Sequence, residues 1–194
     1  MFLHPARHFA DARIATDDAS FATTALPGAL IAGTRVETAG GWRDVAHLRA
    51  GDRLQTFDGG LRPLIAVEQV RLVPEAGRMA IRIEGGTLGA CDDLTLLPGA
   101  QVLIATGKTR PEAARALVPA LSLRGVPGVV TVPLDGPVSA VRPVFADDEV
   151  IWANTGVLLF SPGPVRTAQF PALDPAAARH ALARRSAPLF RRAA

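Results

Sequence analysis

Short apolar or alternating segments, separated by glycine-rich turns, run from about Leu30 to Phe160. This pattern and its spacing are typical of an all-β domain. The turn sequences Ala-Gly-Gly, Phe-Asp-Gly-Gly and Leu-Pro-Gly lie between neighbouring segments, where glycine and proline favour tight connections. The expected strands are 30–36, 42–45, 53–56, 64–72, 79–84, 94–97, 101–105, 129–132, 140–145 and 149–153.

Two stretches interrupt the β pattern and favour helix. Thr109 as N-cap, with a proline in the first turn, predicts a short helix at about 111–117. Near the C-terminus, Asp174 as N-cap and Pro175 at the first helical position predict a second helix with an alanine-rich body. Pro188 marks the expected end of that second helix.

These elements divide the chain into three expected parts. They are a flexible leader (1–25), a β domain (26–165) and a linker with the C-terminal helix (166–194). The leader mixes His, Arg and Asp without the apolar core of a secretory signal. No stretch approaches the roughly 18 consecutive apolar residues of a membrane helix. We therefore expect no membrane segment, and the cytoplasm as the default location.

The charge and aromatic content disfavour a nucleic acid as the partner of this chain. The net charge is +3, and Lys108 is the only lysine among 21 basic residues. A nucleic-acid surface combines clustered basic residues with aromatics, whereas this chain is 5% aromatic and has no tyrosine. We expect no nucleic-acid partner, although a small basic β-barrel that binds nucleic acid stays open as an alternative.

Cofactor and metal chemistry have little support in the sequence. Cys91 is the single cysteine, which excludes an internal disulfide and a cysteine-based metal cluster. The adjacent acids 147–149 supply the oxygen ligands that hard cations prefer. Three neighbouring side chains at the entry of a strand point in different directions, however, so a solvated turn is expected there. We predict no cofactor and no metal site.

Four segments occur in an order and spacing that resemble the bacterial Hedgehog/intein, or Hint, domain. They are 29–60, which begins Ala-Leu-Ile-Ala-Gly-Thr, 81–104, 116–123 and 147–164. Their common order is more specific than any one motif. The resemblance implies an all-β fold, a pseudo-symmetric horseshoe or barrel of short strands with a C-terminal helix. It also implies that the first residue of the domain lies at the centre of the fold.

The resemblance further implies a chemistry that this chain lacks the groups to perform. In an active member, a leading Cys attacks the preceding carbonyl and a His protonates the departing nitrogen. The Cys position falls on Ala29. The His position falls on Ala100, in Leu-Pro-Gly-Ala, where the family has Ser-Pro-x-His or Thr-x-x-His. The sequence thus predicts a degenerate Hint domain without self-splicing or autoproteolysis, acting as a structural or interaction module for an unidentified protein partner.

Residual autoproteolysis near Gly28-Ala29 by a displaced nucleophile is the alternative enzymatic hypothesis. Cys91 is one candidate because a thiolate is a strong nucleophile, but two adjacent aspartates disfavour the thiolate. Thr34 is the other, although its place in the Gly-Thr pair predicts hydrogen bonding in a turn.

Overall fold

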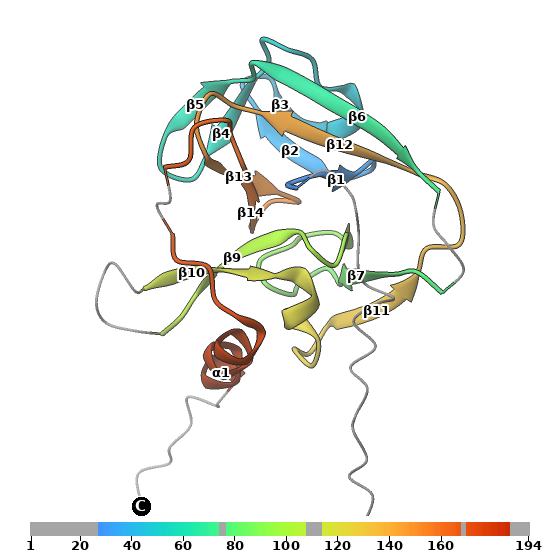
Figure 1. Ribbon diagram of the computed structural model, residues 1–194, viewed down its shortest axis with the longest axis vertical. Helices are drawn as coiled ribbons and strands as arrows, with labels where there is room; N and C mark the ends of the chain where they lie inside the picture. Colours follow the sequence, from blue (N-terminus) through green and yellow to red (C-terminus); the bar gives the residue numbers. More distant parts are fainter. Residues whose placement is uncertain (1–26, 74–76, 108–113, 168–169, 187–194) are drawn as a thin grey trace, which may run out of the picture.

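The computed structural model describes residues 27–73, 77–107, 114–167 and 170–186, and it consists mainly of short strands (Figure 1). The strands are β1 (Leu30–Ile31), β2 (Arg35–Thr38), β3 (Gly41–Asp44), β4 (Arg53–Thr56), β5 (Gly60–Pro63), β6 (Ala66–Leu72), β7 (Met79–Ile83), β8 (Leu94–Leu96), β9 (Gln101–Ala105), β10 (Arg115–Pro119), β11 (Val129–Pro133), β12 (Val138–Val144), β13 (Glu149–Ala153) and β14 (Val157–Ser161). Two 3-10 turns, η2 (Val45–His47) and η4 (Ala120–Leu123), and the helix α1 (Pro175–Ser186) complete the described elements. The expected all-β fold with a C-terminal helix is confirmed.

The two halves of the chain repeat one arrangement of strands. In the first half β1 precedes the hairpin β2–β3, which runs into η2; in the second half β8 precedes the hairpin β9–β10, which runs into η4. The two three-stranded sheets have corresponding strand orders, β1-β12-β6 and β8-β7-β11. In each of them, the two outer strands come from one half of the chain and the middle strand comes from the other half. Each half therefore completes its sheet with a central strand from the other half. This exchange confirms the expected pseudo-symmetry.

A long antiparallel ribbon links the two sheets. β6 pairs with β12 from Ala66 to Leu72, and β7 pairs with β11 from Met79 to Ile83. Between them the amide of Leu134 donates to the carbonyl of Arg78 at 3.0 Å. The two pairings thus follow one another along one side of the molecule (Figure 1).

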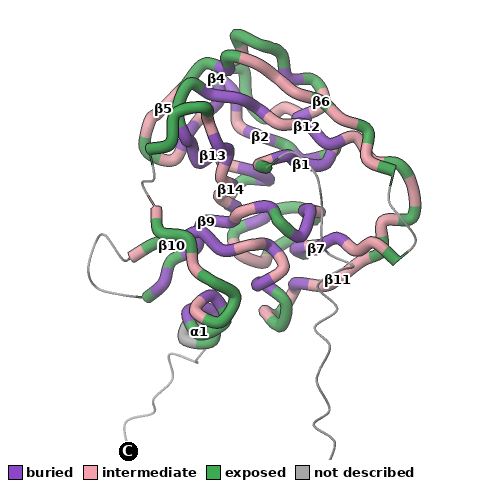
Figure 2. Tube along the Cα trace, viewed as in Figure 1, coloured by how far each residue is buried: buried purple, intermediate pink, exposed green. Residues whose placement is uncertain are grey.

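The largest buried cluster collects side chains from both halves. Leu30, Leu54, Ile81, Leu94 and Ile151 are each at most 2% exposed and belong to it. The buried stretches of β1, β2, β9, β13 and β14 converge in the middle of the molecule (Figure 2). Burial of apolar surface is the main favourable term in folding, so the two halves stabilise one another.

The expected helix at 111–117 is wrong in its second part. Residues 115–119 form β10, which pairs with β9 along its whole length. Ala116, Leu117 and Val118 are buried there, and the backbone of Leu117 also bonds to a later segment through Pro171. These long-range contacts outweigh a helix propensity of a few tenths of a kcal/mol per residue. Thr109 and the start of the expected helix lie outside the described residues.

Other expectations hold or change in detail. The expected strand 30–36 is broken into β1 and β2 by a turn, in which Gly33 has a φ of 98°. β5 and β14 were not expected. Helix α1 begins as predicted, since the Asp174 carboxylate accepts from the amides of Ala176 and Ala177 at 2.9 and 2.8 Å. The leader and Pro188 lie outside the described residues. In the part of the chain that is described, no helix is long and apolar enough to span a membrane.

A close approach between two glycines provides a test of the packing. A Cβ atom on Gly156 would lie 2.3 Å from the carbonyl oxygen of Gly89, whereas one on Gly136 would have nothing within 4 Å. We expect Gly156→Ala to lower the free energy of unfolding by ~1–3 kcal/mol because the backbones must move apart. Gly136→Ala is the control and should be neutral or slightly stabilising. Chemical denaturation of both variants measures the difference, and equal stabilities would contradict this packing.

Candidate functional site

Ala29, the position that leads the domain, lies in the interior. It directly precedes β1 and is 2% exposed. Its buried neighbours in the same cluster are Ile31, Leu97 and Ala140. The partly buried residues packed against that cluster are apolar as well. Nothing in this cluster can attack a carbonyl or donate a proton.

Gly28 is held against the end of β14. A Cβ atom on Gly28 would lie 2.3 Å from Cδ of Pro162 and 3.4 Å from the carbonyl oxygen of Phe160. Its φ of 78° is also in the left-handed region, which glycine adopts without steric cost. The peptide bond between Gly28 and Ala29 therefore occupies a fixed place between β1 and β14.

Ala100 lies in the loop 97–100, between β8 and β9. Ala100 is 6% exposed, and its amide donates to the carbonyl of Leu97 at 2.9 Å. Its own carbonyl accepts from the amide of Ala120 in η4 at 2.7 Å. Leu97 is 4% exposed and packs in the cluster of Ala29. Leu97 thus joins the loop of Ala100 to the segment that contains Ala29.

Cys91 lies in the loop between β7 and β8, is exposed, and contacts the turn between β13 and β14. Its Sγ is 2.6 Å from Oγ1 of Thr155 and 3.7 Å from a carboxylate oxygen of Asp92. Its amide donates to the carbonyl of Asn154 at 3.1 Å. These contacts hold the thiol beside the start of β14.

Cys91 and Gly28 therefore lie at opposite ends of β14. Cys91 contacts Thr155, before the strand, whereas Gly28 contacts Pro162, after it. The five residues of β14 span about 16 Å at ~3.3 Å per residue. A nucleophile must come to about 3–3.5 Å from the carbonyl that it attacks. The structure does not bring this thiol together with the junction.

Thr34 is a buried residue of the turn between β1 and β2, at 3% exposure. Its amide donates to the carbonyl of Ile31 at 3.1 Å, and its carbonyl accepts from the amide of Val45 at 2.9 Å. The amide of Gly33 beside it donates to the Asp44 carboxylate at 3.0 Å. These are the backbone hydrogen bonds expected of a turn residue.

The acids 147–149 do not form the expected solvated turn as a group, because only Asp147 is exposed. Asp148 is 6% exposed and Glu149 is 9% exposed. The two carboxylate oxygens of Asp148 accept from the amides of Gly163 and Thr167 at 3.0 and 3.1 Å. The carboxylate thus fixes the segment that follows β14. Nowhere in the described residues does a group of three or more His, Cys, Asp or Glu side chains gather that could hold a metal ion.

Glu149 has a different environment. Its carboxylate lies 3.5 Å from the guanidinium of Arg62. Burial raises the pKa of Glu149 above its usual value of 4.5, and a hydrogen bond with Thr56 and the charge of Arg62 offset part of that rise. The ionised form is therefore less favourable in the folded protein than in water.

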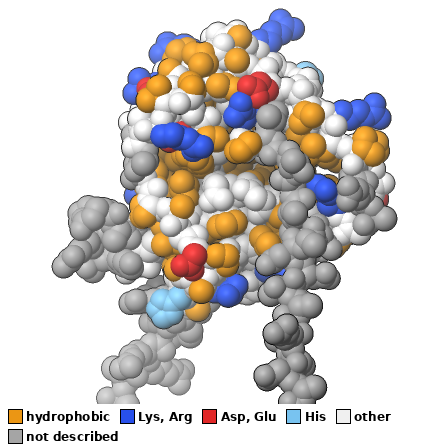
Figure 3. Space-filling view, viewed as in Figure 1, with side chains coloured by type: hydrophobic (Ala, Val, Ile, Leu, Met, Phe, Trp, Pro, Cys, Tyr) orange, Lys and Arg blue, Asp and Glu red, His pale blue; other side chains and the backbone are white. Residues whose placement is uncertain are grey.

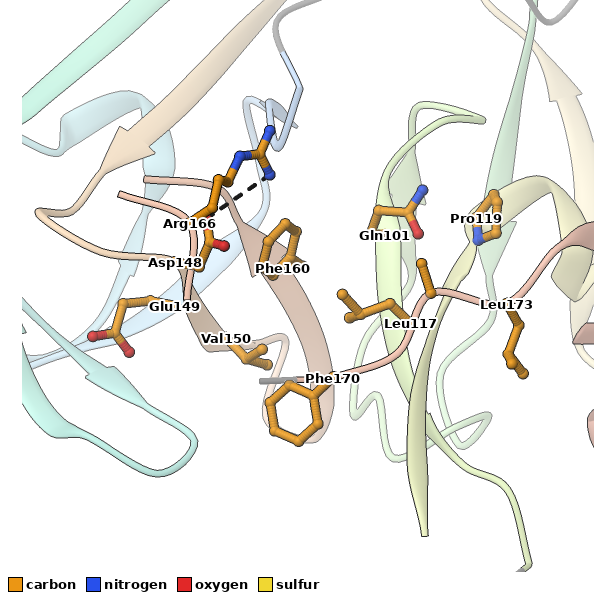
Figure 4. Close-up of a pocket in the computed structure, with 11 residues that line it drawn as sticks. Gln101, Leu117, Pro119, Asp148, Glu149, Val150, Phe160, Arg166, Phe170 and Leu173 are labelled. Atoms are coloured by element: carbon orange, nitrogen blue, oxygen red, sulfur yellow. Dashed lines mark ion pairs between the residues drawn. The ribbon is translucent and has the colours of Figure 1, made fainter. Parts of the chain in front are cut away.

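An apolar cavity begins next to Ala100, at Gln101. Its volume is about 520 Å³, and it lies between β9–β10 and β13–β14, with the segment after β14 along one side. Phe160, Val150, Phe170 and Leu117 surround the central space in Figure 4. Gln101, which follows Ala100, stands at its rim together with the ion pair of Asp148 and Arg166.

Basic side chains are dispersed on the face seen in Figure 3, among apolar and neutral ones, rather than gathered into one patch. Several basic side chains of the described residues are paired with carboxylates, including Arg43 with Asp52 at 3.1 Å and Arg142 with Glu68 at 2.7 Å. This distribution differs from the clustered basic and aromatic face of a nucleic-acid site.

The sequence matches the family model described as the Hint domain over residues 28–158. The chain belongs to the Hint domain family. None of the curated proteins compared with it matches its sequence.

Several solved structures are similar to this Hint domain at low sequence identity. A splice-inactive variant of the AceL NrdHF class 3 split intein is 14% identical, with a TM-score of 0.47, over 70% of this chain and 97% of that chain. The bacterial intein-like domain from Clostridium thermocellum is 12% identical, with a TM-score of 0.46, over 71% and 100%. The MchDnaB-1 intein is 16% identical, with a TM-score of 0.40, over 68% and 98%.

Two further residues of this Hint domain gain importance from the structure. Leu97 packs in the cluster of Ala29, and its place at the start of Leu-Pro-Gly-Ala was the signal that could have singled it out. Asn154 is 5% exposed; its side chain accepts from the amide of Arg35 at 2.9 Å and donates to the carbonyl of Asp93 at 3.0 Å. It therefore ties the turn before β14 to β2 and to the loop of Cys91, a role that no local pattern predicts.

The raised pKa of Glu149 gives a pH-dependent prediction. Below its usual value of 4.5 the carboxyl is protonated in both states. As pH rises through the higher folded pKa, the unfolded chain ionises more readily and the fold loses stability. Glu149→Gln removes this loss, so we expect its stability relative to the wild type to increase with pH.

Thermal unfolding of wild type and variant from about pH 4 to about pH 8 measures this trend. Asp135→Asn is the control, because it removes one carboxylate from an exposed residue that does not influence the pKa of Glu149. A difference between Glu149→Gln and wild type that is constant or shrinks as pH rises would contradict the burial argument.

Proposed function

We propose that this Hint domain does not splice or cleave itself and serves instead as a folded module that binds a protein partner. One observation carries the proposal. All three residues onto which the resemblance to the family pattern places the nucleophile, the hydroxyl residue and the histidine, Ala29, Leu97 and Ala100, are buried.

Without a nucleophile and a general acid, cleavage of the Gly28-Ala29 peptide bond is much slower. An amide nitrogen leaves poorly until it is protonated, and a general acid alone contributes about 10²–10⁴-fold to such a step. A covalent pathway also needs a nucleophile within reach of the carbonyl. The apolar cluster around Ala29 supplies neither group, so the Gly28-Ala29 bond is expected to persist.

The surroundings of a displaced nucleophile argue against residual cleavage. Cys91 lies beyond the far end of β14 from Gly28. Thr34 is fixed by its backbone in the turn that follows β1. Either residue would need a rearrangement of the β1–β2 turn or of β14 to reach the junction.

The apolar cavity between β9–β10 and β13–β14 supports a role in binding. It offers about 520 Å³ lined mainly by apolar side chains, and a mainly apolar pocket with few polar groups is the usual form of a ligand site. Since its rim includes Gln101 and the Asp148–Arg166 pair, a bound segment would meet both apolar and polar groups.

The first test is the intact mass of the full chain after prolonged incubation, with and without a thiol or hydroxylamine. We expect no change in either sample, because no acyl intermediate forms. A fragment that ends at Gly28 would overturn the proposal. In that case Cys91→Ser and Thr34→Val, made separately, would identify the nucleophile.

A second test restores the missing groups. We expect Ala29→Cys with Leu97→Thr and Ala100→His to give hydroxylamine-dependent cleavage after Gly28, whereas Ala29→Cys alone should cleave at least ~100-fold more slowly for lack of an acid. Mass spectrometry follows the products and circular dichroism checks the fold. A folded triple variant that yields no cleavage would contradict the assignment of these positions.

A further inference from the structure

The outer edge of β6 is open in the described structure. β6 forms one side of the sheet β1-β12-β6 and pairs only with β12. It is seven residues long and contains no proline. An edge strand presents unpaired amide and carbonyl groups that another strand can bind.

The other edges among the described sheets are shorter, shielded or end in proline. β1, β3 and β8 have two, four and three residues. β5 ends at Pro63 and β11 ends at Pro133, and proline cannot donate to a ladder. The edge of β10 is covered, because Leu117 exchanges backbone hydrogen bonds with Pro171 and Leu173. β6 is thus the long edge that lacks these protections.

Exposed hydrophobic side chains flank β6 at both ends. Ile65, directly before the strand, is 52% exposed and Val73, directly after it, is 72% exposed. Only Trp42 and Val165 share this property among the described large hydrophobic residues. Ile65 and Val73 therefore lie at the ends of the open edge, where a strand paired with β6 would meet them.

We propose that β6 pairs antiparallel with β6 of a second copy of this chain, about a twofold axis at Gln69. A twofold axis perpendicular to a sheet keeps each side chain on its own face, so facing residues are an even number apart in sequence. Ile65 and Val73 are eight residues apart. In this register, Ile65 of each copy lies opposite Val73 of the other.

The charges of the strand are compatible with this register. Glu68 faces Val70 of the other copy and is held by Arg142 of its own chain, whose guanidinium donates two hydrogen bonds at 2.7 and 3.0 Å. Arg71 faces Val67 of the other copy. No like charges lie directly opposite, which would destabilise the pair.

The proposed pairing uses the backbone edge of β6 that faces away from β12, whereas the side chains of Val70 and Leu72 in the same strand pack against the cluster of Ala29. The dimer therefore goes beyond the proposed function, and its failure would leave the loss of self-processing unaffected.

Sedimentation equilibrium of the full chain over a concentration series tests the association. We expect a monomer–dimer equilibrium in which Ile65→Lys and Val73→Lys each raise the dissociation constant at least ~10-fold. Val165→Lys is the matched control, an equal change at a residue 56% exposed elsewhere, and should leave the constant unchanged. A monomer up to ~1 mM, or a dimer insensitive to both β6 substitutions, would overturn the proposal.

Disulfide trapping tests the register in a Cys91→Ser background. Gln69→Cys should form a crosslinked dimer on oxidation, because facing Cα atoms in an antiparallel pair are about 4.5–5.5 Å apart. Arg71→Cys should not, since its two copies would be offset by four residues, about 13 Å, beyond the reach of a disulfide. Crosslinking at Arg71→Cys but not at Gln69→Cys would reject this pairing.

Discussion

The exchange of β7 and β12 between the two halves is the constraint on which the rest of this Hint domain depends. Each strand is the middle of a sheet whose other strands come from the opposite half of the chain. Central strands bond on both sides, so neither sheet is complete until both halves are present. The exchange also brings β1 against β8, which places Ala29 and the loop of Ala100 in one interior.

The residues in that interior can be either reactive polar groups or apolar packing residues. Polar reactive groups buried there would need hydrogen-bond partners, because an unsatisfied buried polar group costs about 1–3 kcal/mol. Ala29, Leu97 and Ala100 have no such requirement, and they join apolar clusters. In the proposed non-processing domain, the site between the halves contributes to stability in place of catalysis, a common trade between function and stability.

The apolar cavity and the open edge of β6, both within the described residues, have different origins. The cavity forms because Asp148 holds the chain after β14 alongside β10, with Gly163 so close to the carbonyl of Asp147 that a Cβ atom would lie 2.3 Å from it. The β6 edge exists because the exchanged strand β12 satisfies only one side of β6. The cavity can take up apolar side chains, and the edge of β6 can pair with another strand.

The sequence by itself determined the features that depend on near neighbours. Alternation and glycine turns predicted most strands, Asp174 predicted the start of α1, and the ordered motifs predicted the family. Tertiary structure alone decided that residues 115–119 form β10, that Asp148 is buried and that Cys91 lies beyond the far end of β14 from the junction. Each of these depends on hydrogen bonds and packing between segments distant in sequence, which local propensity does not encode.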